Sequence, residues 1–422
     1  MFKYWTLIIL SIFYFSNSYS ITLNQAVEIG LQNSHEYIME LNRLKAAENA
    51  NKSNISAYLP NISLNYQTGI KQDIRGDSDS NDDFGNETSE NISLSQPIFN
   101  GFKSINNSNK SEFEFLAASK AFEYFERDLI YRIIESYIEL QKWQKVKFFT
   151  KQNLNNYYVI LKQIKSKASY GSNNELIDYK INFALAKQEL RLIEKHLFDA
   201  ELEFQNLVSS DFNELSDPDI ELHHLELNLL LKDINSNPEA MQKHYEYLAL
   251  LAENKILTGE LLPKISLEAS HTKQSNVVYL NGEDLETKSI LLDVKIPLFN
   301  QGSRFFNIKE GRYNANIKAQ EYELTLAKIK KEISSKYKEY NLHYNDYNQV
   351  FKIHKLIANK LAKNQKSYNL NLLDKVSLLK LKIDKNEAEI KFIESDSNLY
   401  KAYFKIKTLT EKGRFANIFL ND

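Results

Sequence analysis

The chain has 422 residues, of which 43% are apolar and 26% are charged, and its formal net charge is −2. This length is enough for more than one ordinary hydrophobic core. The near balance of charges gives no sign of a nucleic-acid-binding protein. Cysteine is absent, which excludes disulfides, thiolate metal sites, cysteine nucleophiles and an N-terminal lipid on cysteine.

The first twenty residues have the features of a secretory signal peptide. Lys3 precedes an apolar run from Leu7 to Phe15, and Ser18 and Ser20 supply small residues at the −3 and −1 positions of a cleavage site. The alternative is an N-terminal membrane anchor, for which this run is short. We expect residues 1–20 to be removed on export.

Two proline phrases occur twice, in the same order. AYLPNISLNY (57–66) is followed by SQPIFNG (95–101), and ELLPKISLEA (260–269) is followed by KIPLFNQG (295–302). Such a repeat, with a period of about 200 residues, indicates a duplicated structural unit. We expect a first repeat at 21–210, a connector at 211–236, a second repeat at 237–413 and a C-terminal tail at 414–422.

The segments bounded by these prolines alternate between apolar and polar residues. The apolar positions are Ile62, Leu64, Tyr66, Ile92 and Leu94 in the first repeat and Ile265, Leu267, Ala269, Ile290, Leu292, Val294 and Ile296 in the second. A period of two is typical of strands with one apolar and one polar face. We expect hairpins at about 60–98 and about 263–298, with loops at 71–90 and 272–287.

A very long helix is predicted after each hairpin. No glycine or proline occurs between Phe102 and Tyr170, or between Arg312 and Lys412, and apolar residues in the first segment recur in steps of three and four. We expect long helices at about 102–169 and about 303–367, each followed by a tight turn and another helix. A helix of about 67 residues is roughly 100 Å long. It needs a helical partner to cover its apolar stripe.

Two hairpins supply four strands, which cannot close a barrel alone. One interpretation is that other parts of the protein cover the strand edges. The other is a membrane barrel, because the strands have the length and alternation that a membrane-spanning strand requires. Open edges cannot lie in lipid, so other copies of the chain would have to complete that barrel. The residues alone leave both interpretations open.

Taken together, these features resemble the TolC-like outer-membrane efflux protein family, the outer membrane factors, over nearly all of the mature chain. The resemblance rests on the opening ITLNQAVEIGLQNS, the paired proline phrases and the helix interruptions at Gly171 and Asn371. It implies a mainly α fold with a membrane β-barrel, in which the duplicated helix-strand-strand-helix repeat forms a homotrimer. That trimer would have a 12-stranded barrel, a 12-helix periplasmic tunnel and an equatorial belt containing the connector.

The resemblance implies a passive duct in the outer membrane of a Gram-negative-type cell, extending into the periplasm. The duct would serve efflux of small molecules or type I protein secretion. Its partners would be outer-membrane lipid, a periplasmic adaptor (membrane fusion) protein, and an inner-membrane pump such as a resistance-nodulation-division or ABC transporter. The helix coiled coils would splay at the periplasmic tip to open it. The alternative is a periplasmic or surface helical stalk or adaptor that forms no channel.

No pattern in the sequence argues for an enzyme. Nucleophile elbows, phosphate-binding glycine loops and His-Glu-x-x-His motifs are absent. DSDSN at 77–81 resembles the start of a calcium loop but lacks its later glycine and glutamate. His223 and His224 have no third ligand at a suitable spacing. We expect neither catalysis nor a cofactor, metal or nucleic-acid site.

The resemblance also suggests which residues form the periplasmic aperture. Tyr368 matches the family tyrosine at the second helix turn, and Asn371 stands where glycine is usual. Ser377 and Lys380 occupy positions that are acidic in some members, so an acidic ring at these positions is doubtful. Three copies of a lumen-facing Lys380 would favour anions, whereas an outward-facing Lys380 is a surface lysine. The gating candidates are therefore Asp178, Tyr368, Asn371, Asp374, Ser377 and Lys380.

Two further sets of positions have expected structural roles. The helix turns at Gly171 and Asn371 are the expected docking points for the adaptor. The proline phrases are expected to redirect each second strand into a long helix, since proline cannot donate to a strand ladder. The residues of these strand-to-helix turns are Pro97, Gly101, Pro297 and Gly302.

Overall fold

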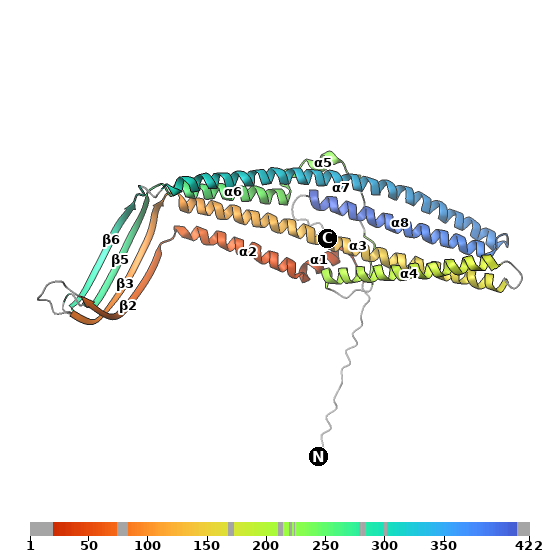
Figure 1. The fold of residues 1–422 in the computed structure, drawn as a ribbon, viewed down its shortest axis with the longest axis horizontal. Helices are drawn as coiled ribbons and strands as arrows, with labels where there is room; N and C mark the ends of the chain where they lie inside the picture. The colour runs from red at the N-terminus through yellow and green to blue at the C-terminus, as the bar shows by residue number, and fades with distance from the viewer. Residues whose placement is uncertain are drawn as a thin grey trace, which may run out of the picture. The chain divides into compact units, whose positions relative to one another are not determined.

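The computed structural model describes most of the chain between Ser20 and Glu411. The ranges are 20–73, 83–167, 173–209, 214–218, 222, 224–277, 280, 283–298 and 302–411. The expected signal peptide up to residue 19, the DSDSN segment, Gly171, His223 and the C-terminal tail lie outside the described residues. The described part is mainly helical, with one four-stranded and one two-stranded sheet (Figure 1).

The chain divides into two compact units, each built from segments of both sequence halves. Unit 1 consists of Met1–Ile38, Phe125–Asp233 and Lys330–Asp422, and unit 2 of Met39–Tyr124 and Ile234–Ile329. Helices α2 (His35–Ile55), α3 (Lys103–Lys167) and α7 (Ser303–Asn369) contribute residues to both units. No described helix is both long enough and apolar enough to cross a membrane.

Unit 2 contains an antiparallel sheet in the order β2-β3-β5-β6 (Figure 1). Its strands are β2 (Asn61–Asp73), β3 (Asp83–Asn100), β5 (Lys264–Val277) and β6 (Glu283–Lys295). The strands therefore extend well into the segments expected to be loops at 71–90 and 272–287, and those expected boundaries are wrong. Pairing depends on the backbone, and polar cross-strand contacts such as Thr68 Oγ1 to Thr88 Oγ1 (3.1 Å) let it continue beyond the apolar residues.

The pairing register confirms the apolar and polar faces predicted from alternation. Residues paired across antiparallel strands share a face of the sheet. One row across all four strands is Ile62, Leu94, Ala269 and Ile290. The next row, on the opposite face, is Ser63, Ser93, Ser270 and Ser289. The apolar face is open, and Ile290, for example, is 78% exposed.

The remaining elements of unit 2 include the short helix η1 (Ser56–Tyr58), η3 (Ile234–Ser236) and α6 (Pro238–Gly259). Asn237 caps α6 by accepting a hydrogen bond from the backbone N–H of Glu239 (3.0 Å), and Pro238 follows at a position where its missing N–H costs nothing. The side chain of Asn54 on α2 donates to Ser111 Oγ on α3 (2.9 Å).

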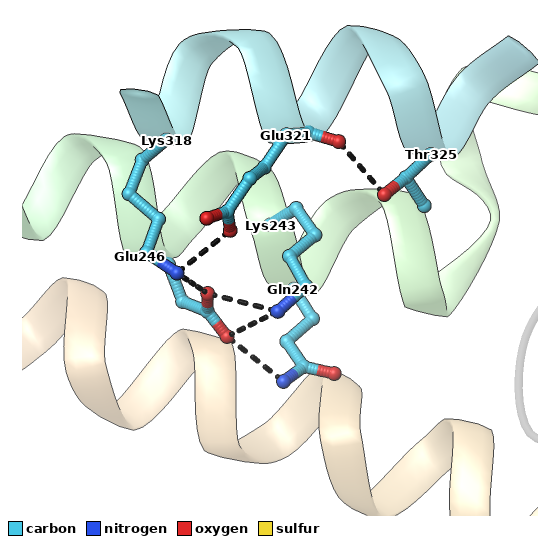
Figure 2. A network of polar contacts seen from close by, with 6 residues as sticks. All are labelled: Gln242, Lys243, Glu246, Lys318, Glu321 and Thr325. Carbon is cyan, nitrogen blue, oxygen red and sulfur yellow. Dashed lines mark hydrogen bonds and ion pairs between the residues drawn. The ribbon is translucent and has the colours of Figure 1, made fainter. Parts of the chain in front are cut away.

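A polar network joins α6 to α7 within unit 2 (Figure 2). Lys318 Nζ on α7 lies 3.2 Å from Glu246 Oε2 on α6 and 2.7 Å from Glu321 Oε2. Lys243 and Gln242 also donate to the Glu246 carboxylate. Burial opposes ionisation of Glu246, but these hydrogen bonds outweigh it and lower its pKa. The network therefore fixes α6 along α7 with a satisfied charge.

Unit 1 holds the main hydrophobic core around α1 (Leu23–Asn33) and the middle of α3. Thr22 and Gln25 form a reciprocal capping box at the start of α1. The other elements are β1 (Ser20–Ile21), α4 (Asn173–Val208), β4 (Glu214–Leu215), α5 (Leu227–Leu231) and α8 (Lys375–Thr410). Strands β1 and β4 pair in parallel. The buried Tyr137 hydroxyl on α3 lies 2.8 Å from Ile21 O and 2.7 Å from Ser216 O, which ties both strands to the core.

Candidate functional site

The turn between α7 and α8 has a defined backbone. Helix α7 ends at Asn369, and Asn371 has a φ of +59°, in the left-handed region expected from its place in the sequence. The Leu372 backbone N–H donates to Ser367 O and the Asn371 N–H to Tyr368 O, each at 2.9 Å. The left-handed residue thus lets the backbone satisfy the last carbonyl groups of α7.

Asp374 begins helix α8 as its N-cap. Its carboxylate accepts hydrogen bonds from the backbone N–H groups of Val376 (2.9 Å) and Ser377 (3.1 Å), and from the Ser377 hydroxyl. The hydrogen bonds from Ser377 and Val376 lower the pKa of Asp374. Asp374 and Ser377, two of the aperture candidates, are therefore coupled to each other, and Asp374 stabilises the helix start.

Three helices meet behind this turn in a small apolar cluster. Its buried members are Ile160 and Ile164 on α3, Tyr179 on α4, and Leu379 and Ile383 on α8. Lys380 Nζ lies 5.2 Å from the centroid of the Tyr179 ring, within cation–π range. The Tyr179 hydroxyl raises the pKa of Lys380. Lys380 therefore links α8 to α4, while its side chain remains largely exposed.

The other aperture candidates are less closely connected. Asp178, next to Tyr179, is exposed, and Tyr368 is half-buried. Both Asp178 and Asp374 lie in the described part of the chain, and no hydrogen bond or ion pair joins them. The apolar side chains of Leu370 and Leu372 flank Asn371 and are 70% and 76% exposed. The second helix turn therefore presents an apolar surface that the sequence analysis did not single out.

An acidic group lies further along α8 that the sequence analysis missed. Burial raises the pKa of Glu387, and the charges of Asp384 and Glu189 raise it further. The same three carboxylates raise the pKa of Tyr157 on α3, where burial is again the main cause. Steps of three and four residues place Ser377, Lys380, Asp384 and Glu387 along one face of α8. This spacing was the available signal in the sequence.

The two strand-to-helix turns share a backbone conformation but differ in their surroundings. Gly101 and Gly302 have φ values of +69° and +70°. A Cβ on Gly101 would lie 2.1 Å from the carbonyl oxygen of Gly259, whereas one on Gly302 would meet nothing within 4 Å. Gly101 is thus required both by its conformation and by a close backbone contact with the end of α6.

The two prolines of these turns also differ in their relation to the sheet. Strand β6 ends at Lys295, before Pro297, as expected for a residue that terminates pairing. Strand β3 instead continues past Pro97 to Asn100, with a register shift between Pro97 and Phe99. A bulge tolerates the missing N–H, so pairing does not stop at the first proline as expected.

The chain is similar in sequence to outer-membrane efflux proteins. Residues 27–206 match the family model described as outer membrane efflux protein. A curated relative, the outer membrane efflux protein BepC of Brucella suis biovar 1, is 22% identical over 285 residues. That match covers 66% of this chain and 61% of the relative, so the chain spans less than two thirds of that protein's length.

Solved structures with the same fold are outer-membrane channels. The Campylobacter jejuni CmeC outer membrane channel matches with a TM-score of 0.76 and 15% identity, covering 94% of this chain and 88% of that chain. The outer membrane protein VceC from Vibrio cholerae matches with a TM-score of 0.74 and 15% identity, covering 93% and 96%. At these identities the likeness establishes the fold.

Proposed function

We propose that the chain is a member of the outer membrane efflux protein family and forms a passive exit duct in the outer membrane that reaches into the periplasm. Its match to that family's model over residues 27–206 and its similarity to BepC support this proposal. The duct is a homotrimer with a twelve-stranded barrel and a twelve-helix tunnel. A periplasmic adaptor connects it to an inner-membrane pump of the resistance-nodulation-division or ABC type. The pump supplies the energy and selects the cargo.

The observation that carries this proposal is the open apolar face of the four-stranded sheet. Residues of both hairpins contribute to it in register, and the opposite face is mostly polar and includes the row Ser63, Ser93, Ser270 and Ser289. This is the arrangement of a membrane strand with lipid on one side and water on the other. Strands β2 and β6 each pair on one side only within the described residues. Pairing of β2 with β6 of the next copy would remove these edges.

Helix α4 offers a second surface for the neighbouring copies. Large apolar side chains along it are exposed, and they recur mainly in steps of four and seven residues: Ile177, Ile181, Leu185, Leu192, Phe198 and Leu202. Such a stripe is characteristic of a helix that packs against another helix. We propose that a second copy of the chain covers it and that the tunnel wall is completed in this way.

The oligomeric state and location of the protein test the duct directly. We expect detergent-extracted protein from an outer-membrane fraction to give the mass of three chains, each lacking residues 1–20, by native mass spectrometry. The purified trimer should then conduct ions across a planar bilayer. A monomer recovered from the soluble periplasm would leave the sheet edges unpaired. That result would favour the helical stalk over the duct.

The proposed opening movement separates α8 from α4 at the tip. Asp178, Tyr368, Asn371, Asp374, Ser377 and Lys380 are the residues we propose to control it, and the turns containing Gly171 and Asn371 are the proposed docking points for the adaptor. The exposed Leu370 and Leu372 flank the second turn. Replacing both with Glu should reduce export while leaving trimer mass unchanged. Normal export by this variant would argue against docking at the turn.

The ion selectivity of the aperture follows from the charges along α8. Because Lys380 contacts Tyr179, we expect Lys380→Ala to change the cation-to-anion permeability ratio less than the pair Asp384→Asn and Glu387→Gln. Removing the two carboxylates should shift the ratio toward anions. Reversal potentials in a salt gradient measure this ratio. A larger effect from Lys380→Ala would mean that the lysine, and not the acidic pair, sets the charge of the pore.

A further inference from the structure

Unit 1 contains a cavity of about 1010 Å³ that the duct function does not use. Parts of α3, α4 and α8 line it, together with Tyr347 on α7, Leu215 at the end of β4, and Asp217 and Pro218 after it. Its volume corresponds to the upper end of ligand pockets in proteins. Much of the wall is aromatic, from Phe148, Phe149, Tyr347, Phe392 and Tyr400.

Most of the charged groups on the cavity wall already have partners. Lys145 forms an ion pair with Asp217, and Lys142 forms one with Glu139. Glu389 accepts from His354 (2.8 Å) and Lys385 (2.7 Å). Lys145, Asp217 and Glu389 thus have partners of opposite charge, whereas Lys142 shares Glu139 with Lys401.

Asp396 differs from these paired groups. It lies on α8, lines the cavity, and forms no hydrogen bond or ion pair with any described residue. Lys147 and Glu201 are also partly buried residues of the wall, and they carry opposite charges. Asp396 is therefore a carboxylate on the cavity wall that pairs with no cation among the described residues.

The surroundings of Asp396 make this charge costly. Burial raises its pKa to about 6, Lys145 on α3 partly opposes the shift, and Asp217 after β4 adds to it. The side chain is thus ionised at neutral pH in a site that solvates it poorly. A cation beside it would remove that cost.

We propose that this cavity binds a compact organic cation, with a primary ammonium or amidinium group paired to Asp396 and an apolar or aromatic body against the ring-lined wall. Aromatic faces and a carboxylate together favour a cation over an anion or a neutral molecule. The site goes beyond the duct function, because it assigns a ligand to the helices of a single protomer.

Direct calorimetric titration of the full-length protein in detergent tests this proposal. Phenethylamine is the cationic probe, and 2-phenylethanol is a neutral probe of nearly the same size. We expect the amine to bind at least about tenfold more tightly than the alcohol, a ratio that corresponds to about 1.4 kcal/mol. Equal affinities, or no saturable binding of the amine in the millimolar range, would overturn the proposal.

Two matched variants locate the binding site. Asp396→Asn keeps the shape of the side chain and removes its charge, so it should weaken amine binding about tenfold and leave alcohol binding unchanged. Glu194→Gln removes an exposed carboxylate on α4 that does not line the cavity and should affect neither probe. Unchanged trimer mass and circular dichroism establish that each variant is folded. Equal amine affinity in wild type and Asp396→Asn would show that the carboxylate does not hold the amine.

The pH dependence gives an independent readout of the same carboxylate. The amine remains charged from pH 7.5 to pH 5, whereas Asp396 becomes protonated as pH falls through about 6. The charged and titratable groups on the cavity wall around Asp396 include Lys145, Asp217, Tyr347 and Tyr400. Amine affinity should therefore decrease about tenfold over this range in wild type and stay nearly constant in Asp396→Asn. A flat profile in wild type would contradict the pairing with Asp396.

Discussion

Helices α4 and α8 occupy equivalent places in the two halves of the chain and have the same length, 36 residues. They bury very different fractions of their apolar side chains. Helix α4 exposes a row of large apolar residues, including Leu192 at 53%. Over Lys375–Thr410, all of which the structure describes, α8 exposes no large apolar side chain.

The two helices therefore share a length but not an environment. Helix length follows from local features, such as the N-cap at Asp374 and the absence of glycine and proline. Burial depends on which other elements pack against each face. Helix α8 finds its partners within its own chain, at the main core and at the tip cluster. The row on α4 has the properties of a surface that another copy covers.

The largest expected effect comes from a buried side chain of α8. Leu399 is 1% exposed in the main core, so Leu399→Ala should lower the free energy of unfolding by about 2–5 kcal/mol. Leu192→Ala on α4 should cost the protomer about 0.5 kcal/mol or less but weaken trimer assembly. Denaturant midpoints and native mass spectrometry measure the two effects separately. Equal losses of stability would contradict the difference in burial between the helices.

The two strand-to-helix turns provide a second comparison between the halves. Gly101→Ala must accommodate a left-handed conformation and a backbone clash with Gly259, so we expect a loss of about 3 kcal/mol. Gly302→Ala has to accommodate only the left-handed conformation, so we expect it to lower the free energy of unfolding by about 1 kcal/mol. Thermal or denaturant unfolding of the two variants measures this ratio. A Gly302 variant as unstable as the Gly101 variant would mean that another copy packs closely against the second turn.

A pH-dependent effect should distinguish Asp396 on α8 from Glu194 on α4. The pKa of Asp396 is about 6 in the folded protein, above its ordinary value of 3.8. Its ionisation therefore lowers the free energy of unfolding by the full amount above pH 6 and has no effect below pH 4. Asp396→Asn should therefore raise stability by about 1–2 kcal/mol at pH 7.5 and by little at pH 4.

Glu194→Gln is the control, since Glu194 is exposed, and it should change stability little at either pH. Denaturant midpoints across this pH range measure both variants. A gain from Asp396→Asn that is as large at pH 4 as at pH 7.5 would show that its origin is not the buried charge.

The smallest effect is expected at the start of α8. Asp374→Ala removes the N-cap and should cost about 1 kcal/mol. Asp178→Ala should cost less, because Asp178 lies inside α4 and not at its N-cap. The pKa of Asp374 is lower in the folded protein than its ordinary value. Its carboxylate therefore stabilises the fold at pH values above the ordinary pKa, and this stabilisation is lost as pH falls through the pKa of the folded protein. The difference between the variants should therefore disappear in strong acid. Hydrogen exchange of the first turn of α8 measures the local effect.

Part of the candidate site was predictable because its causes are local. The repeated phrases identified the two glycine turns, and Asn371 has the left-handed backbone expected of it. The contact of Lys380 with Tyr179 joins two helices from different halves of the chain, and no spacing indicated it. The acidic group around Glu387 likewise depends on Glu189 of another helix.

The sequence by itself determined the elements of this protein: the strand faces from a period of two, the long helices from the lack of glycine and proline, and the duplication from its proline phrases. Each of these rests on interactions between residues a few positions apart. Only the tertiary structure decided that α8 is buried and α4 is open, and that Gly101 meets Gly259. It also decided that Asp396 faces a cavity and has no hydrogen-bond or ion-pair partner among the residues that the structure describes. Those features arise from contacts between distant segments, and burial and electrostatic fields exist only once the segments have packed together.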